Sequence, residues 1–485
     1  MVRSLFGAVA ALILLGGVVL VRTLAVRPAD VPPPAPAIYI NGMSVARHLA
    51  EAVRFETVSY PRGAQEAEKD EALGALGQWL AATYPKFHAA AKREAIGRSL
   101  LYTWQGSDPA LKPVLLMAHM DVVPVVPGTE KDWVHPPFSG AIDGGYVWGR
   151  GAIDDKGALV AIMEAMERLA ASGFTPKRTV MIALGADELT GGMKGDALIA
   201  KTLATRGTHF EFVLGGGDAI VEEPFPGLLT PVAFLGVAEK GYLSLELVAH
   251  GEGGQSARPT RDMAIARLAS AITKVMHRPF RSGIGDIEYA QLRALAPVMA
   301  FAPRMLVANL WIAKPALIRF LETQPESAAR LTTTIAPTML MAGVKDNVLP
   351  PVARAIVNFR LNPRDNIDDV VEHVRRAIDD PKVDIDVLAH GSDGDLKASD
   401  MNGPAYKFLA DEIAASFGVP VVPDRAITST DARHFLRLAD SVLRFNPFHS
   451  GPDDLSRVNG SNERLAVGDL APAVAFYMRL IQDAK

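Results

Sequence analysis

The sequence predicts an α/β fold built around a mostly parallel sheet, and three of its features support this prediction. Residues 114–118, 180–184 and 212–214 are short apolar runs, the pattern of strands that are buried on both faces. Between the first two runs, apolar side chains recur at the spacing of one helix face; they are Leu159, Ile162, Met163, Met166 and Leu169. A strand, a helix and a second strand in this order are typical of parallel sheets covered by helices.

The pattern changes in the second half of the chain. Residues 242–249 and 352–361 alternate between apolar and polar side chains, as strands with one exposed face do. A helical stretch at 263–276 lies between them, followed by a moderately apolar segment at 294–321 whose charged residues argue against a membrane span. We therefore expect a second structural unit in this part of the chain.

Length and composition limit the classes of function. The 485 residues are enough for two domains. A net charge of −4 gives no sign of a nucleic-acid-binding protein, which usually carries a basic patch. The chain has no cysteine, so disulfides and thiolate metal sites are excluded. Any metal must be held by histidine or carboxylate side chains.

The N-terminus differs from the rest of the chain. Residues 5–21 are uninterruptedly apolar and lie between Arg3 and Arg22. A membrane-spanning helix needs about 17–25 such residues, whereas the apolar core of a cleaved signal peptide has about 7–15. Both readings stay open, and the lack of a clear small-x-small cleavage motif favours an anchor in residues 1–26. The proline-rich residues 27–37 are predicted to form a stiff spacer.

Two motifs carry the strongest functional signal. The first is His119-Met120-Asp121, and the second reads Gly149-Arg150-Gly151-Ala152-Ile153-Asp154-Asp155-Lys156-Gly157. A lone His-x-Asp is weak evidence, because such residues are often only capping or solvated groups. Together the two motifs resemble peptidase family M20, which contains co-catalytic zinc peptidases and amidohydrolases. The resemblance is to its carboxypeptidase S branch, which includes N-acyl-amino-acid hydrolases, and it extends from residue 38 to the C-terminus.

This resemblance implies a domain organisation. A zinc-peptidase-like catalytic domain with a mostly parallel sheet would comprise residues 38–240 and 391–485. An α+β lid domain of the dimerisation type would be inserted at 241–390, so a homo-oligomer is among the expected assemblies.

The resemblance also implies roles for four residues. His119 corresponds to a ligand private to the first metal, and Asp154 to the carboxylate that bridges two metals. Asp121 would orient the imidazole of His119, which fixes its tautomer. Glu188 occupies the position of the general base, which takes a proton from water and passes it to the leaving amine.

Three other ligand positions of the family are replaced in this chain. Leu189 and Asn459 stand where the family has the private ligands of the second metal, and Gly215 stands where it has a carboxylate ligand of the first. Asp218 is a candidate replacement for the lost carboxylate if its loop repacks, and a plain turn residue is the favoured reading. We expect at most one zinc per chain, held by His119 and Asp154.

Three further positions are expected to bind substrate. Gln255 replaces a lid histidine that helps to polarise the scissile carbonyl, and it can still donate a hydrogen bond. Asn347 matches a lid position of the family. Arg433 would bind a substrate carboxylate through its guanidinium fork. Without the resemblance, Asn347 and Arg433 would be read as ordinary polar surface residues.

Two hypotheses about function follow. The chain is either a metallo-hydrolase that cleaves amide bonds of N-acyl amino acids or small peptides, or a non-catalytic relative. The non-catalytic relative would bind a carboxylate ligand or a protein partner through the cleft that corresponds to the active site of the family. The resemblance favours a folded part that is anchored to the membrane outside the cytoplasm, or secreted.

Overall fold

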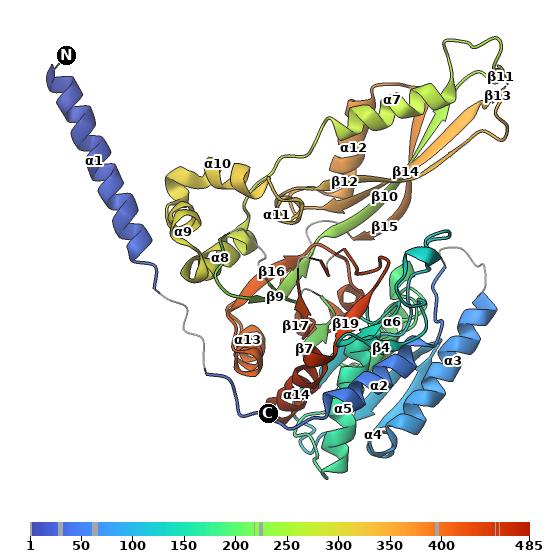
Figure 1. The fold of residues 1–485 in the computed structure, drawn as a ribbon, viewed down its shortest axis with the longest axis vertical. Helices are drawn as coiled ribbons and strands as arrows, with labels where there is room; N and C mark the ends of the chain where they lie inside the picture. The colour runs from blue at the N-terminus through green and yellow to red at the C-terminus, as the bar shows by residue number, and fades with distance from the viewer. Residues whose placement is uncertain are drawn as a thin grey trace.

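The computed structural model describes residues 2–27, 33–60, 66–217, 219–222, 227–392, 397–451, 453–454 and 456–485. Within these residues the chain forms a large mixed sheet, a separate antiparallel sheet and an N-terminal helix that projects from the body (Figure 1).

The large sheet has the strand order β1-β2-β6-β3-β7-β17-β9-β8-β18, and β16 pairs with β9. Its strands are β1 (Lys92–Ile96), β2 (Ser99–Trp104), β3 (Val114–His119), β6 (Val180–Gly185), β7 (Phe210–Gly215), β8 (Ile220–Val221), β9 (Val232–Glu239), β16 (Val421–Ala426), β17 (Ala439–Arg444) and β18 (His449–Ser450).

The three apolar runs form the centre of this sheet. Strand β3 pairs in parallel with both β6 and β7, and β7 pairs in parallel with β17. Every residue of β3 and β6 is buried, as expected for strands covered on both faces. Antiparallel strands β1 and β2 lie at one edge. The predicted α/β class with a mostly parallel sheet is confirmed.

Helices cover both faces of the large sheet. One face carries α2 (Gly42–Val53), α3 (Glu66–Thr83), α4 (Pro85–Ala90), α5 (Lys156–Ala171), α13 (Pro404–Phe417) and α14 (Val467–Asp483), which share a single apolar core. The other face packs against α6 (Asp196–Thr205) and the 3₁₀ turn η4 (Asp431–Phe435). The apolar residues predicted at helical spacing lie in α5 and are buried.

The second sheet is antiparallel, with the order β12-β14-β10-β15. Its strands are β10 (Gly241–His250), β12 (Thr334–Ala342), β14 (Val352–Leu361) and β15 (Val383–Ser392). Helices α7 (Ala264–Met276) and α12 (Ile367–Ile378) pack on one face, where leucines of β10 join their apolar side chains. At the far end, β11 (Gly254–Gln255) pairs with β13 (Val348–Leu349). The second structural unit that the sequence predicts in this part of the chain is therefore present as a separate antiparallel sheet with helices on one face.

Four helices that lie between α7 and β12 in the chain pack on the large sheet. They are α8 (Asp286–Leu295), α9 (Phe301–Ala308), α10 (Leu310–Leu321) and α11 (Pro325–Leu331). Their apolar side chains share a core with Val232 and Phe234 of β9 and Val422 of β16. Part of the interval 241–390 therefore lies against the catalytic sheet, and the proposed domain boundaries stay a prediction.

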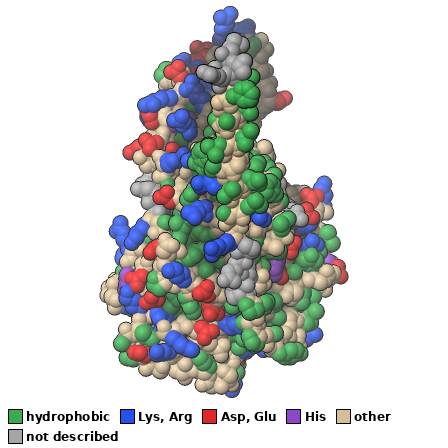
Figure 2. Space-filling model, turned by 90° about the vertical axis from the view of Figure 1, so that its left-hand side faces the viewer, with side chains coloured by type: hydrophobic (Ala, Val, Ile, Leu, Met, Phe, Trp, Pro, Cys, Tyr) green, Lys and Arg blue, Asp and Glu red, His purple; other side chains and the backbone are tan. Residues whose placement is uncertain are grey.

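The N-terminal helix α1 (Val2–Leu24) is long and apolar enough to cross a membrane. Its segment Leu5–Leu24 has a mean hydropathy of 2.4, and almost all of its side chains are exposed. The apolar side chains of this helix form a column on the face that Figure 2 shows. Among the described residues, α1 contacts the body near its C-terminal end, where Asn309 Nδ2 donates hydrogen bonds of 3.2 Å to the Val19 carbonyl and to Thr23 Oγ1.

Candidate active site

The candidate site lies where the central parallel strands end. His119 is the last residue of β3 and is paired with Gly185, the last residue of β6. Gly215 ends the neighbouring strand β7. Because the carboxyl ends of parallel strands share one edge of a sheet, the loops that follow meet there, which is the usual place for a site in open α/β sheets.

Asp154 is held at this edge by a buried ion pair. Glu463 Oε1 accepts hydrogen bonds from the backbone N–H groups of Ile153 (3.0 Å) and Asp154 (3.2 Å). Its other oxygen accepts one from Arg150 Nη1 at 2.6 Å. Arg150 and Glu463 are almost fully buried. The turn before α5 is therefore fixed from the C-terminal part of the chain, a role that the sequence analysis did not assign to Glu463.

His119 is oriented from both sides of its ring. Nδ1 lies 2.9 Å from the Asp121 carbonyl oxygen, and Nε2 lies 3.0 Å from Asp154 Oδ1. When Nδ1–H donates to the carbonyl, Nε2 faces a carboxylate, so only a proton or a cation can lie between them. Burial lowers the pKa of His119, but the carboxylates of Glu188, Asp121 and Asp154 outweigh it and raise the pKa well above its ordinary value.

Asn459 is hydrogen-bonded to the other carboxylate oxygen of Asp154. Its Nδ2 donates a hydrogen bond of 2.7 Å to Asp154 Oδ2. Asn459 has a φ of 60°, in the left-handed region that asparagine tolerates better than most residues. Both oxygens of Asp154 thus face a nitrogen, one from His119 and one from Asn459.

Asp121 connects His119 to the loop that carries the candidate base. Its carboxylate accepts the backbone N–H groups of Glu188 (3.2 Å) and Leu189 (3.3 Å) at the start of η2 (Glu188–Thr190). Ser59 Oγ donates to the same carboxylate at 2.5 Å and itself accepts from Lys69 Nζ at 2.6 Å. Asp121 therefore sets the position of Glu188 relative to His119.

Gly215 leaves little room for a side chain. A Cβ atom at this position would lie 3.0 Å from the Ala432 Cβ, so a larger residue requires Ala432 to move. Asp218, the candidate replacement ligand, lies outside the described residues.

Arg433 lies close to the loop of Glu188, but its guanidinium is used by the protein itself. Nη2 donates to the Gly191 carbonyl at 2.8 Å, and Nη1 donates to the Thr430 carbonyl at 2.9 Å and to Ser429 Oγ at 3.2 Å. The side chain is only 10% exposed. A substrate carboxylate would have to displace some of these contacts.

Gln255 and Asn347 are not brought to this edge. Both are exposed and lie at the tip of the lid, where the Ser256 N–H donates to the Asn347 carbonyl at 3.1 Å. The tip, marked by β11 and β13, projects away from the strand ends of the large sheet (Figure 1). Contact with a substrate at His119 would need a movement of the lid or a lid from another chain.

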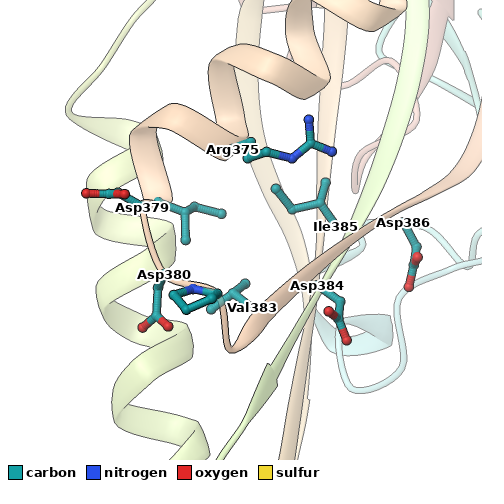
Figure 3. Close-up of a pocket in the computed structure, with 9 residues that line it drawn as sticks. Arg375, Asp379, Asp380, Val383, Asp384, Ile385 and Asp386 are labelled. Carbon is teal, nitrogen blue, oxygen red and sulfur yellow. The ribbon is translucent and has the colours of Figure 1, made fainter.

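The lid also has a cavity of its own. It has a volume of 530 Å³ and lies between the end of α12 and β15 (Figure 3). Four aspartates and Arg375 are among its lining residues. Asp380 is paired with Arg267, and Asp384 with His250. None of the site residues described above lines this cavity.

Comparison with known proteins identifies the family of the chain. The profile of the peptidase family M20/M25/M40 matches residues 115–483. The chain belongs to this family. It is 36% identical to the probable carboxypeptidase S-like 2 of Dictyostelium discoideum, over 92% of this chain and 86% of the relative. It is 35% identical to the N-fatty-acyl-amino acid synthase/hydrolase PM20D1 of Mus musculus, over 91% and 88%. Carboxypeptidase S of Saccharomyces cerevisiae is 30% identical, over 89% and 83%.

Solved structures share the fold of this chain. Human carnosine dipeptidase 1 superposes with a TM-score of 0.69 at 14% identity, covering 91% of this chain and 96% of that one. The M20 family metallo-carboxypeptidase Sso-CP2 of Sulfolobus solfataricus gives 0.66 at 18% identity, covering 90% and 98%. These likenesses concern the fold alone.

Proposed function

We propose that this M20 protein binds N-acyl amino acids or small peptides and cleaves their amide bond slowly, with at most one zinc ion. The observation that carries the proposal is the hydrogen bond from Asn459 to Asp154 Oδ2. A bridging carboxylate needs both oxygens for metals, and here one of them is already bound by an amide. Leu189, at the other private position of the second metal, has no lone pair to donate. The residues on this side do not fit a metal.

The side of the first metal fits better. His119 Nε2 and Asp154 Oδ1 face each other across a gap that must hold a positive charge, and the Asp121 carbonyl fixes the imidazole. When bound there, zinc would polarise the scissile carbonyl and make water more acidic. His119 and Asp154 supply two ligands, and a zinc site usually has about three from the protein. Weak binding is therefore expected.

Glu188 is proposed as the base that acts beside this metal. Its backbone N–H is bound by Asp121, and its carboxylate lies close enough to His119 to raise the pKa of that imidazole. Burial and the carboxylate of Asp431 raise the pKa of Glu188 well above its ordinary value. A raised pKa suits a group that must take a proton from water and return it to the leaving amine.

The substrate class is proposed from the relatives. Their names include an N-fatty-acyl-amino acid synthase/hydrolase and a carboxypeptidase S. An N-acyl amino acid and the C-terminal end of a peptide both have a free carboxylate close to an amide bond. Arg433 would bind that carboxylate after releasing internal contacts, and Gln255 and Asn347 would approach the amide as the lid moves.

The alternative is a non-catalytic protein that binds a carboxylate ligand or a protein partner in the same cleft. Two contacts favour this alternative. Asn459 is hydrogen-bonded to the Asp154 oxygen that would bind the second metal, and the guanidinium of Arg433 is hydrogen-bonded within the protein. The two hypotheses differ in turnover, not in ligand binding.

Membrane attachment through an uncleaved α1 is part of the proposal. Its support is that the last turn of α1 is bound by the body: Thr23 is 0% exposed, and Asn309 is 1% exposed. Arg22 Nε also donates to the Ala308 carbonyl at 3.3 Å. If α1 were removed as a signal peptide, the amide of Asn309 would lose its hydrogen bonds to the Val19 carbonyl and to Thr23 Oγ1.

The decisive experiment measures zinc content and release of free amino acid from N-acyl amino acids by the full-length protein. We expect at most one zinc per chain and slow turnover that His119→Ala and Glu188→Gln abolish. Ligand binding without turnover in the wild type would favour the non-catalytic alternative. Two tightly held zinc ions would contradict the degraded site.

A further inference from the structure

Three carboxylates gather beside the His119–Asp154 pair without being part of it. They are Glu188 of η2, Asp196 at the start of α6 and Asp431 of η4. One oxygen of each lies within 4.8 Å of an oxygen of the other two. Asp196 is 1% exposed and Asp431 is 0% exposed. The three come from separate segments, so only the fold brings them together.

Asp196 has no visible compensation for its buried charge. Neither of its oxygens accepts a hydrogen bond from any described residue, and the same holds for Asp431. Asp431 does have cationic neighbours, because its Oδ1 lies 3.2 Å from Arg433 Nη2 and 3.4 Å from His434 Nε2. A buried carboxylate without a donor is costly, so this cluster needs protons or a cation.

Glycines enclose the cluster closely. A Cβ atom on Gly185 would lie 2.3 Å from Asp196 Oδ2, and one on Gly192 would lie 1.9 Å from Asp431 Oδ2. The backbone can approach the carboxylates this closely at both positions because glycine has no Cβ atom. Gly192 also has a φ of 67°, which few other residues adopt. The two carboxylates thus lie in a narrow cradle of main chain.

We propose that Glu188, Asp196 and Asp431 bind one hard divalent cation of the calcium, magnesium or manganese class. The donor set consists of oxygen alone, which suits these ions better than zinc. The site lies next to the His119–Asp154 pair and is separate from it. A cation bound here engages Glu188, so it holds that carboxylate away from proton transfer. Bound cation and general-base action by Glu188 are therefore mutually exclusive.

The test uses the full-length protein in detergent, stripped with a chelator and then dialysed against calcium, magnesium, manganese or zinc. Element analysis and calorimetric titration with each ion alone give content and affinity. We expect one hard cation per chain in the wild type. Asp196→Asn should weaken its binding by about 100-fold, since even outer partners of a metal contribute about 10–100-fold. The thermal midpoint should rise with cation in the wild type, and Asp196→Asn should need about 100-fold more cation for the same rise.

Two variants distinguish cation binding at this cluster from metal binding at the His119–Asp154 pair, which is the family site. His119→Ala should retain the hard cation, because His119 lies outside the cluster. Asp187→Asn is the matched control in the same loop, where Asp187 Oδ2 accepts the Lys194 N–H, and it should also retain the cation. A wild type that binds none of these ions, or a cation that is lost in His119→Ala but kept in Asp196→Asn, would overturn the proposal. The first result would leave protons as the neutralising charge, and the second would place the cation in the family site.

Discussion

Asn459 and Asp154 lie 305 positions apart in the chain and share a hydrogen bond of 2.7 Å, with the amide of Asn459 as the donor. This contact occupies the oxygen of Asp154 that faces away from His119. In the proposed assignment, Asn459 stands at the position of a histidine ligand, and its amide then supplies a proton donor where a cation would lie.

Restoring the lost ligands should raise the metal content. In the variant with Leu189→Glu, Gly215→Asp and Asn459→His, we expect zinc to rise towards two per chain, because Asp154 regains partners on both sides. Gly215→Asp needs space, since a Cβ there lies 3.0 Å from the Ala432 Cβ, so Ala432→Gly should be combined with it. Element analysis checks the result.

Hydrolysis by the restored protein is a separate question. Turnover should rise only if Glu188 and the lid are correctly placed, and Gln255→His is the next change to add. Glu188→Gln in the restored background is the control that should bind zinc but not turn over. A restored protein that still holds one zinc or none would show that the site geometry itself has been lost.

Glu463 should be essential for stability rather than for chemistry alone. Glu463→Gln leaves Arg150 buried without a counter-charge, and loss of one partner of such a pair costs about 3–5 kcal/mol. Chemical denaturation should show a decrease of this size in the free energy of unfolding. Glu372→Gln, which removes an exposed ion-pair partner, should change it little. Equal effects of the two substitutions would show that the buried pair of Arg150 and Glu463 stabilises the fold no more than an exposed ion pair does.

Lys240 should give the protein a distinctive dependence on pH. It is fully buried at the junction of β9 and β10, and its Nζ donates to the carbonyls of Ala329 (2.8 Å) and Thr332 (2.6 Å). Burial, assisted by Arg360 and Arg425, lowers its pKa to about 7. An unfolded lysine has a pKa of about 10.4, so above pH 7 the unfolded state binds more protons and stability rises with pH.

The effect is isolated by comparing the wild type with Lys240→Met. The free energy of unfolding of the wild type minus that of Lys240→Met should increase by up to about 1.4 kcal/mol per pH unit between about pH 7 and 10. Lys86→Met, at an exposed lysine, is the control and should show no such slope. A pH-independent difference for Lys240→Met would show that the buried amine stays charged.

Removal of residues 1–36 should leave a soluble, folded protein. Among the described residues, the contacts of α1 with the body are confined to its end, near Asn309, so the main cores stay intact. We expect a small decrease in thermal midpoint, because the hydrogen bonds of Asn309 to Val19 and Thr23 are lost while its bond to the Met305 carbonyl remains. Sizing chromatography and thermal melts check this. Aggregation of the truncated chain alone would mean that α1 is packed on the protein and is not an anchor.

The sequence by itself predicted the central strands β3, β6 and β7, because strands buried on both faces must be apolar along their whole length. It also identified the motifs around His119 and Asp154, since these residues lie close together in the chain in a recognisable order. The family that those motifs indicated is the one to which the chain belongs.

Only the tertiary structure determines which groups surround the buried carboxylates of the site. The bond between Asn459 and Asp154, the ion pair of Glu463 and the cluster of Glu188, Asp196 and Asp431 join segments that are distant in the chain. Asp196 gave no signal in the sequence, where it reads as an ordinary acidic residue in the first turn of a helix. The physical reason is that the cost of a buried charge depends on the groups that fold around it, and local sequence does not specify them.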